Sequence, residues 1–394
     1  MVHYNPFDEE VQRGDTYKVY RQLRDEAPCY RIEPYDAWAL SRFADIWAAS
    51  EDNEHYTAAK GTTSSHVLTK VQPVTPMLNM MDPPDHTKLR KELRAFFMPA
   101  RARKLEAWIR ELAAGCLDAR RDAGQIDVID DFAAQVATKV ACEVNGFPAE
   151  DGDLLTELVR RFFKREPGVA GMTADGLAAM NELFGYFVAL TQKRRKSGGE
   201  LDVVKLLTEI ELGGQKLDDM TIASHLSMLI IGGAETFPKV FANLIRRLGE
   251  FPDQRAECAA DPGLIPDAFI EGLRYDMPTQ FLCRVVTKAH EIHGQKLEPG
   301  QPILFLYPSA NRDPREFRDP DSFDIHRRPE RILSFGHGTH SCIGLHVAKM
   351  EGKVCLEETL KRIPDYEVAM DRAERLVTDF VQGYAKLPIT FEPF

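Results

Sequence analysis

The 394-residue sequence has no closely spaced cysteine pair, although it contains seven cysteines. Disulfide frameworks use an even number of thiols, and zinc and iron–sulfur sites use clustered ones. The seven thiols stand apart along the chain, at Cys29, Cys116, Cys142, Cys258, Cys283, Cys342 and Cys355. This pattern argues against a disulfide-stapled, zinc-binding or cluster-binding protein.

A long apolar run is also missing. The most apolar stretch covers residues 226–234, far short of the roughly 20 residues that a membrane span needs. The first ten residues contain neither a basic segment nor an apolar segment of the kind found in secretion signals. We therefore expect a cytoplasmic protein with no membrane anchor.

Excess positive charge is absent as well, because the net charge is −11 at pH 7. An acidic surface repels a phosphate backbone, so we expect no nucleic-acid partner. Hydrophobic residues make up 44% of the chain and charged residues 28%, enough for a large core with a polar surface. No linker, repeat or low-complexity tract divides the sequence, which predicts a single domain over residues 1–394.

Cys342 stands out from the other cysteines because glycines surround it in the run FGHGTHSCIG. Glycines such as Gly338 and Gly344 let backbone N–H groups approach a thiolate without a Cβ in the way. Helix-forming residues follow over 345–356, and a helix N-terminus also stabilises an anionic sulfur. A lone cysteine is usually an inert small hydrophobe, but this spacing favours a ligand loop.

The loop resembles the haem-ligand signature of the cytochrome P-450 family, the haem-thiolate monooxygenases. The positions that carry the resemblance are Phe335, Gly336, Gly338, His340, Cys342 and Gly344. It implies haem b, with Cys342 as the metal ligand and His340 as a donor to a haem propionate. The alternative for His340 is a solvated loop histidine.

A second cluster, Gly232-Gly233-Ala234-Glu235-Thr236, lies within a helical pattern. Each glycine costs a helix roughly 1 kcal/mol relative to alanine, which favours a role in making room for a ligand. The threonine hydroxyl can bond back to the preceding turn, and Pro238 should kink the helix nearby. The cluster is similar to the family's oxygen-binding segment, which implies that Glu235 and Thr236 relay protons. A plain helix contact made by small residues is the alternative.

The segment Glu271-Gly272-Leu273-Arg274 places an acid and a base three residues apart on one helix face. Such a pair is usually a weak surface contact. The resemblance instead implies a buried network in which Glu271 and Arg274 join Arg327.

The resemblance also implies three basic partners for the haem propionates, whose carboxylates need pairing in an apolar pocket. His86 and Arg90 are four residues apart on one helix face, and Arg284 lies ten residues after Arg274. Each is otherwise an ordinary solvated side chain.

The expected activity is insertion of one oxygen atom from O2 into a small hydrophobic molecule, by hydroxylation, demethylation or epoxidation. Family topology suggests pocket contacts from four parts of the chain: residues 64–80, the region of Phe162/Phe163 and Phe184/Phe187, residues 279–282 and residues 380–381. Phe281, Leu282 and Val381 are the single candidates among them. The sequence does not name a substrate or its site of oxidation. No dinucleotide-binding fingerprint follows a strand. We therefore expect NAD(P)H to act indirectly, through a reductase and a ferredoxin or flavodoxin-type donor.

An acidic ferredoxin could dock on basic residues expected near the cysteine face. These residues are Lys91, Arg94, Arg101, Arg103, Lys104 and Lys349. A scattered solvated surface is the equal alternative. Two other functions stay open: a peroxygenase, which usually lacks the acid–alcohol pair, and a haem-based sensor or ligand carrier, which needs neither a proton relay nor electrons.

The fold expected is mainly α, an α+β cytochrome P-450-type domain with small sheets and haem between the long central helix and the cysteine loop. Helical spacing of apolar residues predicts helices over 15–25, 100–123, 132–145, 153–165, 174–196 and 218–248. Short strands are expected within 29–40, interrupted near Pro34, and within 285–306. We expect a monomer.

Overall fold

Helices dominate the computed structural model, which describes residues 2–13, 16–73, 75–197 and 200–394. The α-helices are α1 (Glu9–Gln12), α2 (Tyr17–Glu26), α3 (Phe43–Glu51), α4 (Ser64–Val67), α5 (Asp85–Arg94), α6 (Pro99–Asp118), α7 (Ala134–Asn145), α8 (Gly152–Phe163), α9 (Ala174–Ser197), α10 (Val203–Glu209), α11 (Asp219–Ala234), α12 (Thr236–Glu250), α13 (Pro252–Ala260), α14 (Ile265–Tyr275), α15 (Tyr307–Ala310) and α16 (Leu345–Arg362). The mainly α class expected from the sequence is confirmed.

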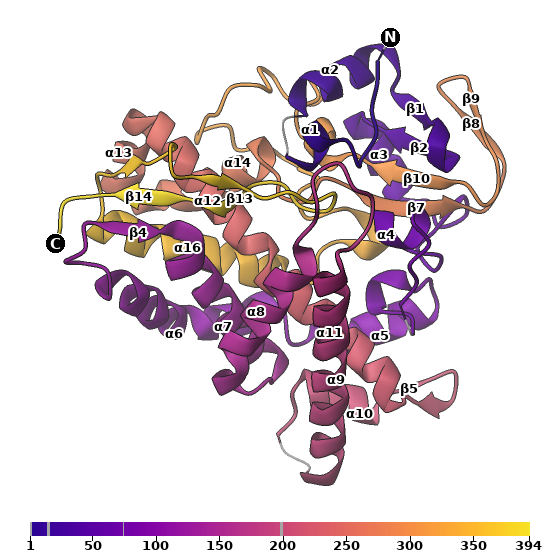
Figure 1. Cartoon of the computed structure of the whole chain (residues 1–394), viewed down its shortest axis with the longest axis horizontal. Coiled ribbons are helices and arrows are strands. Elements are labelled where there is room, and N and C mark those ends of the chain that lie inside the picture. The colour runs from indigo at the N-terminus through magenta and orange to yellow at the C-terminus, as the bar shows by residue number, and fades with distance from the viewer. Residues whose placement is uncertain (1, 14–15, 74, 198–199) are drawn as a thin grey trace.

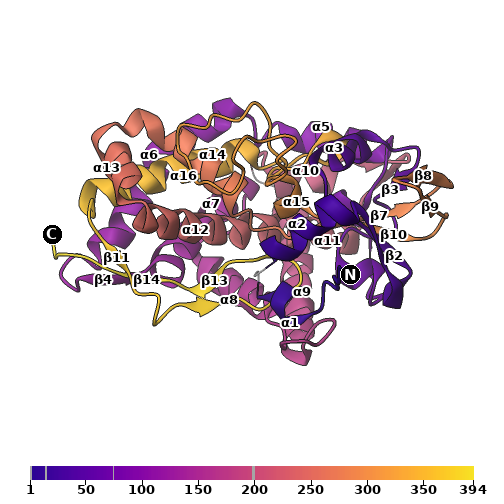
Figure 2. The same cartoon turned by 90° about the horizontal axis from the view of Figure 1, so that it is seen from above.

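The strands are short and form small sheets. They are β1 (Cys29–Ile32), β2 (Ala37–Leu40), β3 (Tyr56–Thr57), β4 (Gln125–Asp127), β5 (Glu211–Leu212), β6 (Gln215–Lys216), β7 (Leu282–Val286), β8 (His290–Ile292), β9 (Gln295–Leu297), β10 (Pro302–Phe305), β11 (Glu367–Val368), β12 (Glu374–Arg375), β13 (Tyr384–Lys386) and β14 (Pro388–Thr390). The largest sheet has the order β1-β2-β10-β7-β3 and lies on the side of the molecule that contains the N-terminus (Figures 1 and 2).

That sheet starts with the strand pair expected over 29–40. β1 and β2 run antiparallel, and the turn between them is a 3₁₀ helix at Glu33–Tyr35. Pro34 occupies its start, where a residue with a fixed φ and no N–H fits. β10 then joins β2 in parallel and β7 in antiparallel fashion, so the region 285–306 pairs with strands more than 200 residues earlier in the chain.

Helix α11 runs through the centre of the helical part, against α7, α8 and α9 (Figure 1). It begins where Asp218 accepts a hydrogen bond from the Thr221 backbone N–H, 2.7 Å away. Helices α14 and α16 pack against each other, and both contact α12. One large hydrophobic cluster joins these helices and buries the apolar faces that the sequence pattern predicts.

The long helix expected over 218–248 is present but broken. α11 ends at Ala234 and α12 begins at Thr236, so the interruption is at Glu235. Pro238 explains the break, because it has no N–H to bond the carbonyl of Ala234 and its ring crowds that turn. The kink that the sequence predicts is therefore found.

Other expected helices differ mainly at their ends. The one over 100–123 stops at Asp118, and the one over 132–145 is preceded by a π-helical segment, Val128–Ala133. Asp127 starts this segment by accepting hydrogen bonds from two backbone N–H groups. The helix expected from residue 15 begins at Tyr17, and residues 14–15 lie outside the described part of the chain.

The α11–α12 stretch, Asp219–Glu250, is long and apolar enough by length and composition to cross a membrane. Within the structure, however, 72% of its most apolar window is buried. Its apolar character is therefore accounted for by its position in the core.

Candidate functional site

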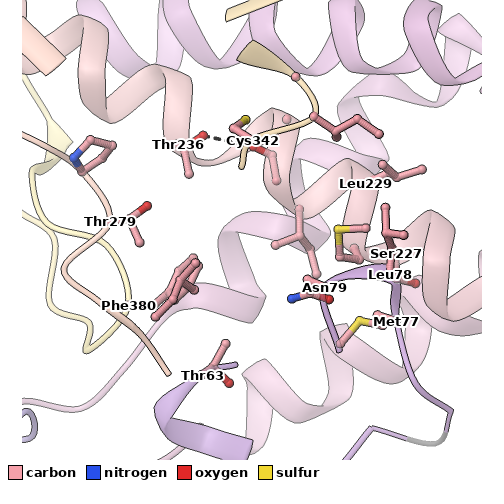
Figure 3. Close-up of a pocket in the computed structure, with 18 of the residues that line it drawn as sticks. Thr63, Met77, Leu78, Asn79, Ser227, Leu229, Thr236, Thr279, Cys342 and Phe380 are labelled. Atoms are coloured by element: carbon pink, nitrogen blue, oxygen red, sulfur yellow. Dashed lines mark hydrogen bonds between the residues drawn. The ribbon is translucent and has the colours of Figure 1, made fainter. Parts of the chain in front are cut away.

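A cavity of about 470 Å³ lies between the cysteine loop, α11, and the segments that contain residues 63–79 and 277–282. Figure 3 shows Cys342 and Thr236 together at one end, with Thr63 and Met77 towards the other. Thr279 and Phe380 lie on one side, and Leu78, Asn79 and Leu229 lie on the opposite side. Most of the lining side chains are apolar, so the cavity suits a hydrophobic molecule.

The cysteine loop holds its thiol through backbone geometry. The N–H of Cys342 donates to the carbonyl oxygen of Phe335, 2.7 Å away, and Gly336 turns the chain with a φ of +66°. The Cys342 side chain lines the cavity. Burial raises the pKa of its thiol, while hydrogen bonds from the Gly344 and Leu345 backbone N–H groups and the charge of Arg90 lower it.

The donors to the sulfur differ in part from those expected. Gly344 donates as predicted, but the second donor is Leu345, the first residue of α16, rather than Gly338. Gly338 serves close packing instead: its φ is +66°, and a Cβ there would lie 2.5 Å from the carbonyl oxygen of Ser50. The expected N–H of Gly338 is therefore replaced by the N-terminus of the following helix.

Two imidazoles and two guanidinium groups gather at the edge of the cavity beside the loop. The rings of His86 and His340 lie with their centroids 4.3 Å apart. Both ring nitrogens of His86 and Nε2 of His340 are buried without a hydrogen-bond partner among the described residues. Arg90 donates to the carbonyl and hydroxyl oxygens of Ser341. The side chains predicted as propionate partners thus meet in one place.

Arg284 is the fourth member, although it does not line the cavity wall. Its guanidinium donates to the carbonyl of Cys283 and is buried. Burial, followed by the charges of Arg284, His86 and Arg90, lowers the pKa of His340 to about 2. Burial, followed by Arg90, also lowers the pKa of His86 to about 4. The cluster is positively charged and holds both imidazoles neutral, which is the electrostatic environment that an anionic group prefers.

The two glycines of the central helix have different surroundings. Gly232 faces open space, with no heavy atom within 4 Å of a Cβ added there. A Cβ on Gly233 would lie 2.9 Å from the Cβ of Ala141 on α7. Thr236 lines the cavity, and its hydroxyl donates to the carbonyl oxygen of Gly232, 3.0 Å away. The back-bond expected for this threonine is therefore present, and Gly232 leaves space beside it.

The surroundings of Glu235 differ from those of Thr236, its neighbour in sequence. It does not line the cavity; it is buried and forms an ion pair with Lys239, in which Oε1 and Nζ are 3.5 Å apart. Burial raises the pKa of its carboxyl, although the neighbouring ammonium group opposes the shift. Of the two expected relay residues, the structure thus places Thr236 on the cavity wall and leaves Glu235 outside it.

Glu271, Arg274 and Arg327 meet in one network. Arg274 and Glu271 are joined by two hydrogen bonds of 2.7 Å, and both are almost fully buried. Nε of Arg327 lies 3.2 Å from a carboxylate oxygen of Glu271. Both arginines also donate to the carbonyl oxygen of Ser322. The network ties α14 to the loop that leads to the cysteine.

The segments expected to form the pocket do so in large part, through residues within 64–80 and through Phe162, Phe163, Phe184, Thr279 and Phe380. Of the three single candidates, only one faces the cavity. Leu282 lines it, whereas Phe281 and Val381 pack into the hydrophobic core, which corrects that prediction. Successive side chains of an extended chain point to opposite faces, so the neighbours of a lining residue turn away. Phe380 correspondingly lines the cavity beside Val381.

A family model described as "Cytochrome P450" matches residues 264–380. The putative cytochrome P450 123 of Mycobacterium tuberculosis (strain ATCC 25618 / H37Rv) is 35% identical over 391 residues, which cover 98% of this chain and 96% of that protein. The chain belongs to the cytochrome P450 family.

Two further similarities span almost the whole cytochrome P450 chain. The vitamin D(3) 25-hydroxylase of Pseudonocardia autotrophica is 31% identical, with 96% of this chain and 94% of that protein covered. A solved structure of a mutant of P450 EryK in complex with erythromycin B has a TM-score of 0.87 and 27% identity, with 97% of both chains covered. This cytochrome P450 is therefore an oxidoreductase of the monooxygenase class, with haem b, O2 and, through redox partners, NAD(P)H.

The residues of this cytochrome P450 fit a haem. The Cys342 thiol lines the same cavity as Gly232, the open position on the central helix. The unpartnered nitrogens of His86 and His340, with Arg90 beside them, suit the two propionates. A thiolate ligand on one side and paired carboxylates at the edge are what this cofactor requires.

Sequence reasoning missed several polar side chains of this cytochrome P450. Glu351 of α16 lines the cavity, is buried, and has one carboxyl oxygen without a partner among the described residues. Arg165 and Asp379 form a buried ion pair at the cavity wall, and Ser64 donates to the same carboxylate. Glu351 had a sequence signal, since it is an acid on the buried face of a helix, but the Arg165–Asp379 pair joins segments 214 residues apart.

Proposed function

We propose that this cytochrome P450 inserts one oxygen atom of O2 into a compact hydrophobic molecule, with electrons delivered by a separate iron–sulfur or flavin protein. The observation that carries the proposal is that Cys342 and Thr236 line the same end of one largely apolar cavity (Figure 3). A thiolate ligand and a hydroxyl group at the same end of the cavity match the needs of oxygen activation. Hydroxylation, demethylation and epoxidation are the reactions of this type.

Cys342 would bind the haem iron, and His86, Arg90, His340 and Arg284 would pair with or neutralise the propionates. When bound, the haem supplies oxygen activation, with electron density from the thiolate favouring cleavage of the O–O bond. Phe335, Gly336 and Gly344 would shape the loop around the sulfur. Gly232 would leave room at the wall that α11 forms. Gly233 would let α11 pack closely on α7, which supports that wall.

Protons would reach the cavity through Thr236 and Glu235. The Thr236 hydroxyl donates to the carbonyl of Gly232, which leaves its oxygen lone pairs free to accept a hydrogen bond; to pass a proton into the cavity, the hydroxyl would turn away from this carbonyl. Glu235 is adjacent in sequence and sits at the helix break, where its own N–H still donates to the carbonyl of Ile231 but Pro238 has no N–H to donate to the carbonyl of Ala234. Its carboxyl would bind a proton away from the cavity and release it towards Thr236.

The lining of the cavity supports an apolar substrate. Besides Leu282 and Phe380, the wall far from Cys342 consists largely of aromatic, branched and methionine side chains. Several methionines, including Met77, Met172, Met180 and Met228, line it, and these flexible side chains adapt to ligand shape. A relative bears the name vitamin D(3) 25-hydroxylase, and hydroxylation is one of the reactions proposed here.

Electrons would enter on the side of the cysteine loop, from a ferredoxin or flavodoxin-type donor that its own reductase recharges. The basic residues expected there are all exposed: Lys91, Arg94, Arg101, Arg103, Lys104 and Lys349. Lys349 lies over the ring of Phe335, at the start of the loop. An acidic donor protein would be attracted to this face, which would raise its association rate at low ionic strength.

We also propose that residues 1–394 act as one domain, as a cytoplasmic monomer. The Glu271–Arg274–Arg327 network would then be structural, holding α14 and the approach to the cysteine loop together. A charge buried in such a network is costly to leave unpaired. Its loss would therefore lower haem retention before it altered the chemistry.

The test is a ligand library screened on the haem-loaded protein by the absorbance change from low-spin to high-spin ferric iron. Ligands that produce the change should also accelerate NAD(P)H consumption when a ferredoxin and its reductase are present. Turnover with hydrogen peroxide but not with the electron-transfer proteins would favour a peroxygenase. Ligand binding without turnover in either system would favour a sensor or carrier.

A further inference from the structure

Arg165 and Asp379 form an ion pair on a cavity wall that is otherwise largely apolar. Arg165 is 8% exposed, Asp379 1% and Ser64 2%. Nε of Arg165 lies 3.3 Å from Oδ1 of Asp379, and the Ser64 hydroxyl donates to Oδ2 of the same carboxylate. All three residues line the cavity. Buried charges therefore meet the space in which a hydrophobic substrate is proposed to bind.

The guanidinium group of Arg165 keeps part of its hydrogen-bonding capacity free. It has five N–H donors. Nε donates to Asp379, and Nη1 donates to the carbonyl oxygens of Phe162 and Lys164, which are 2.8 and 3.1 Å away. Nη2 donates to none of the residues that the structure describes. Because Arg165 lines the cavity, these two N–H groups are available to an oxygen atom of a bound molecule.

The ion pair lies away from the thiol end of the cavity. Ser64 follows Thr63 in the chain, and Asp379 precedes Phe380. Figure 3 shows Thr63 at the end far from Cys342, with Phe380 between the two ends. A molecule held at the ion pair would therefore extend along the cavity towards Cys342.

Aromatic rings flank the ion pair. The rings of Phe163 and Phe380 stack with their centroids 5.6 Å apart, and both residues line the cavity. Hydrogen bonds are electrostatically stronger in such apolar surroundings than in water. Asp379 already offsets the charge of Arg165, so a carboxylate on the substrate would add a second anion beside it. A neutral oxygen adds no charge, and the arrangement favours it.

We propose that Arg165 and Asp379 determine substrate specificity by anchoring a neutral oxygen of the substrate, in a ketone, ester or hydroxyl group, far from the carbon that is oxidised. The proposal rests on the proposed function, since that carbon is the one held near Cys342 and Thr236. The substrate oxygen accepts a hydrogen bond from Nη2, and a hydroxyl group can also donate to the carboxylate. The substrate class is thus a hydrocarbon frame with a neutral oxygen at one end.

The first measurement compares affinities, from the spin-state titration of the haem-loaded protein. The probes are 2-methyldecalin, 2-decalone and decalin-2-carboxylate, and the same three groups at carbon 3 of 5α-androstane. Wild type should bind each ketone about tenfold or more tightly than its methyl analogue, as a hydrogen bond from a charged donor provides. Arg165→Met with Asp379→Asn should lose this preference. The matched change Arg194→Met with Asp202→Asn, at an ion pair outside the cavity, should keep it.

The second measurement is a switch of preference in Asp379→Asn alone. This variant leaves the Arg165 guanidinium without its counter-ion, so the carboxylate probes should gain about tenfold or more in affinity relative to the ketones. A pair that only held the fold together would weaken all three probes alike. If this variant does not take up haem, the double variant, which leaves no charge unpaired, still tests the anchor.

The third measurement is the position of oxidation in the ketone probes, found by mass spectrometry of the products. Wild type should oxidise carbons at the end of the frame remote from the ketone, whereas Arg165→Met with Asp379→Asn should give products at several positions. The same narrow set of products in both proteins would contradict the anchor.

The outcomes separate the anchor from the proposed function. Wild type that binds no ketone probe, prefers the carboxylates, or binds methyl and ketone probes equally overturns the anchor, whatever the variants do. Turnover with equal affinities supports the proposed function alone. Selective binding of the ketones without turnover, with either electron-transfer proteins or hydrogen peroxide, supports the anchor and rejects the proposed function.

Discussion

Gly233 packs directly on Ala141, so closely that a Cβ atom on Gly233 would lie 2.9 Å from the Cβ of its neighbour. Its partner in sequence, Gly232, has open space at the same position. Adjacent glycines thus meet different demands, one from helix packing and the other from the cavity.

Alanine at each glycine should separate these demands. Gly233→Ala should lower the free energy of unfolding by about 1–3 kcal/mol, because α11 and α7 must move apart. Gly232→Ala should keep or slightly raise it, because alanine favours a helix by about 1 kcal/mol, while weakening the spin-state response to ligands. Denaturant unfolding and ligand titration measure the two effects, and equal destabilisation by both variants would contradict this assignment.

Removal of Glu271 should leave two buried arginines without their carboxylate. We expect Glu271→Ala to cost about 3 to 5 kcal/mol of stability and to lower haem content, as measured by thermal unfolding and pyridine haemochrome absorbance. Glu157→Ala is the matched control, because Glu157 pairs with Arg160 at the same spacing but on the surface. Full haem loading with unchanged thermal stability in Glu271→Ala would count against the network.

Replacement of Cys342 tests the metal ligand. In Cys342→Ser the serine oxygen cannot supply the electron density of a thiolate, so the red-shifted absorbance band of the ferrous carbonyl complex should disappear. Cys116→Ser, a change at a cysteine outside the cavity, should keep the band. Persistence of the band in Cys342→Ser would show that Cys342 is not the iron ligand.

Thr236→Ala should separate electron consumption from product formation. The variant loses both the hydroxyl in the cavity and the hydrogen bond to Gly232, so we expect NAD(P)H consumption to continue while peroxide replaces product. Thr279→Ala, at another part of the same cavity, serves as the control for the loss of a threonine. Quantifying peroxide and product together provides the measurement, and undiminished coupling in Thr236→Ala would reject the relay.

Glu351 should make stability fall as the pH rises. Burial raises the pKa of its carboxyl well above 4.5, so between the unfolded and folded values the folded state binds more protons than the unfolded state. Over that range stability should decrease by up to about 1.4 kcal/mol per pH unit. Glu351→Gln, which cannot ionise, should lose this slope, so its stability relative to wild type should be lowest near pH 4 and highest near pH 8. Parallel unfolding curves for both proteins at all pH values would contradict the prediction.

The sequence by itself determined the geometry of the loop at Cys342 and the break in the central helix. Both follow from local rules: glycines permit the turns and N–H approaches of the loop, and Pro238 removes a hydrogen bond one turn earlier. The expected helices are also found at nearly the expected places, because their apolar faces repeat at helical spacing. The ends of these helices do not follow from this spacing, since capping and packing set them.

Only the tertiary structure decided which side chains share a space. It turned Phe281 and Val381 into the core and Leu282 into the cavity, directed Glu235 away from Thr236 and towards Lys239, and joined Arg165 to Asp379. The physical reason is that these outcomes depend on the rotation of each element and on contacts between distant segments. Local preferences along the chain fix neither of them.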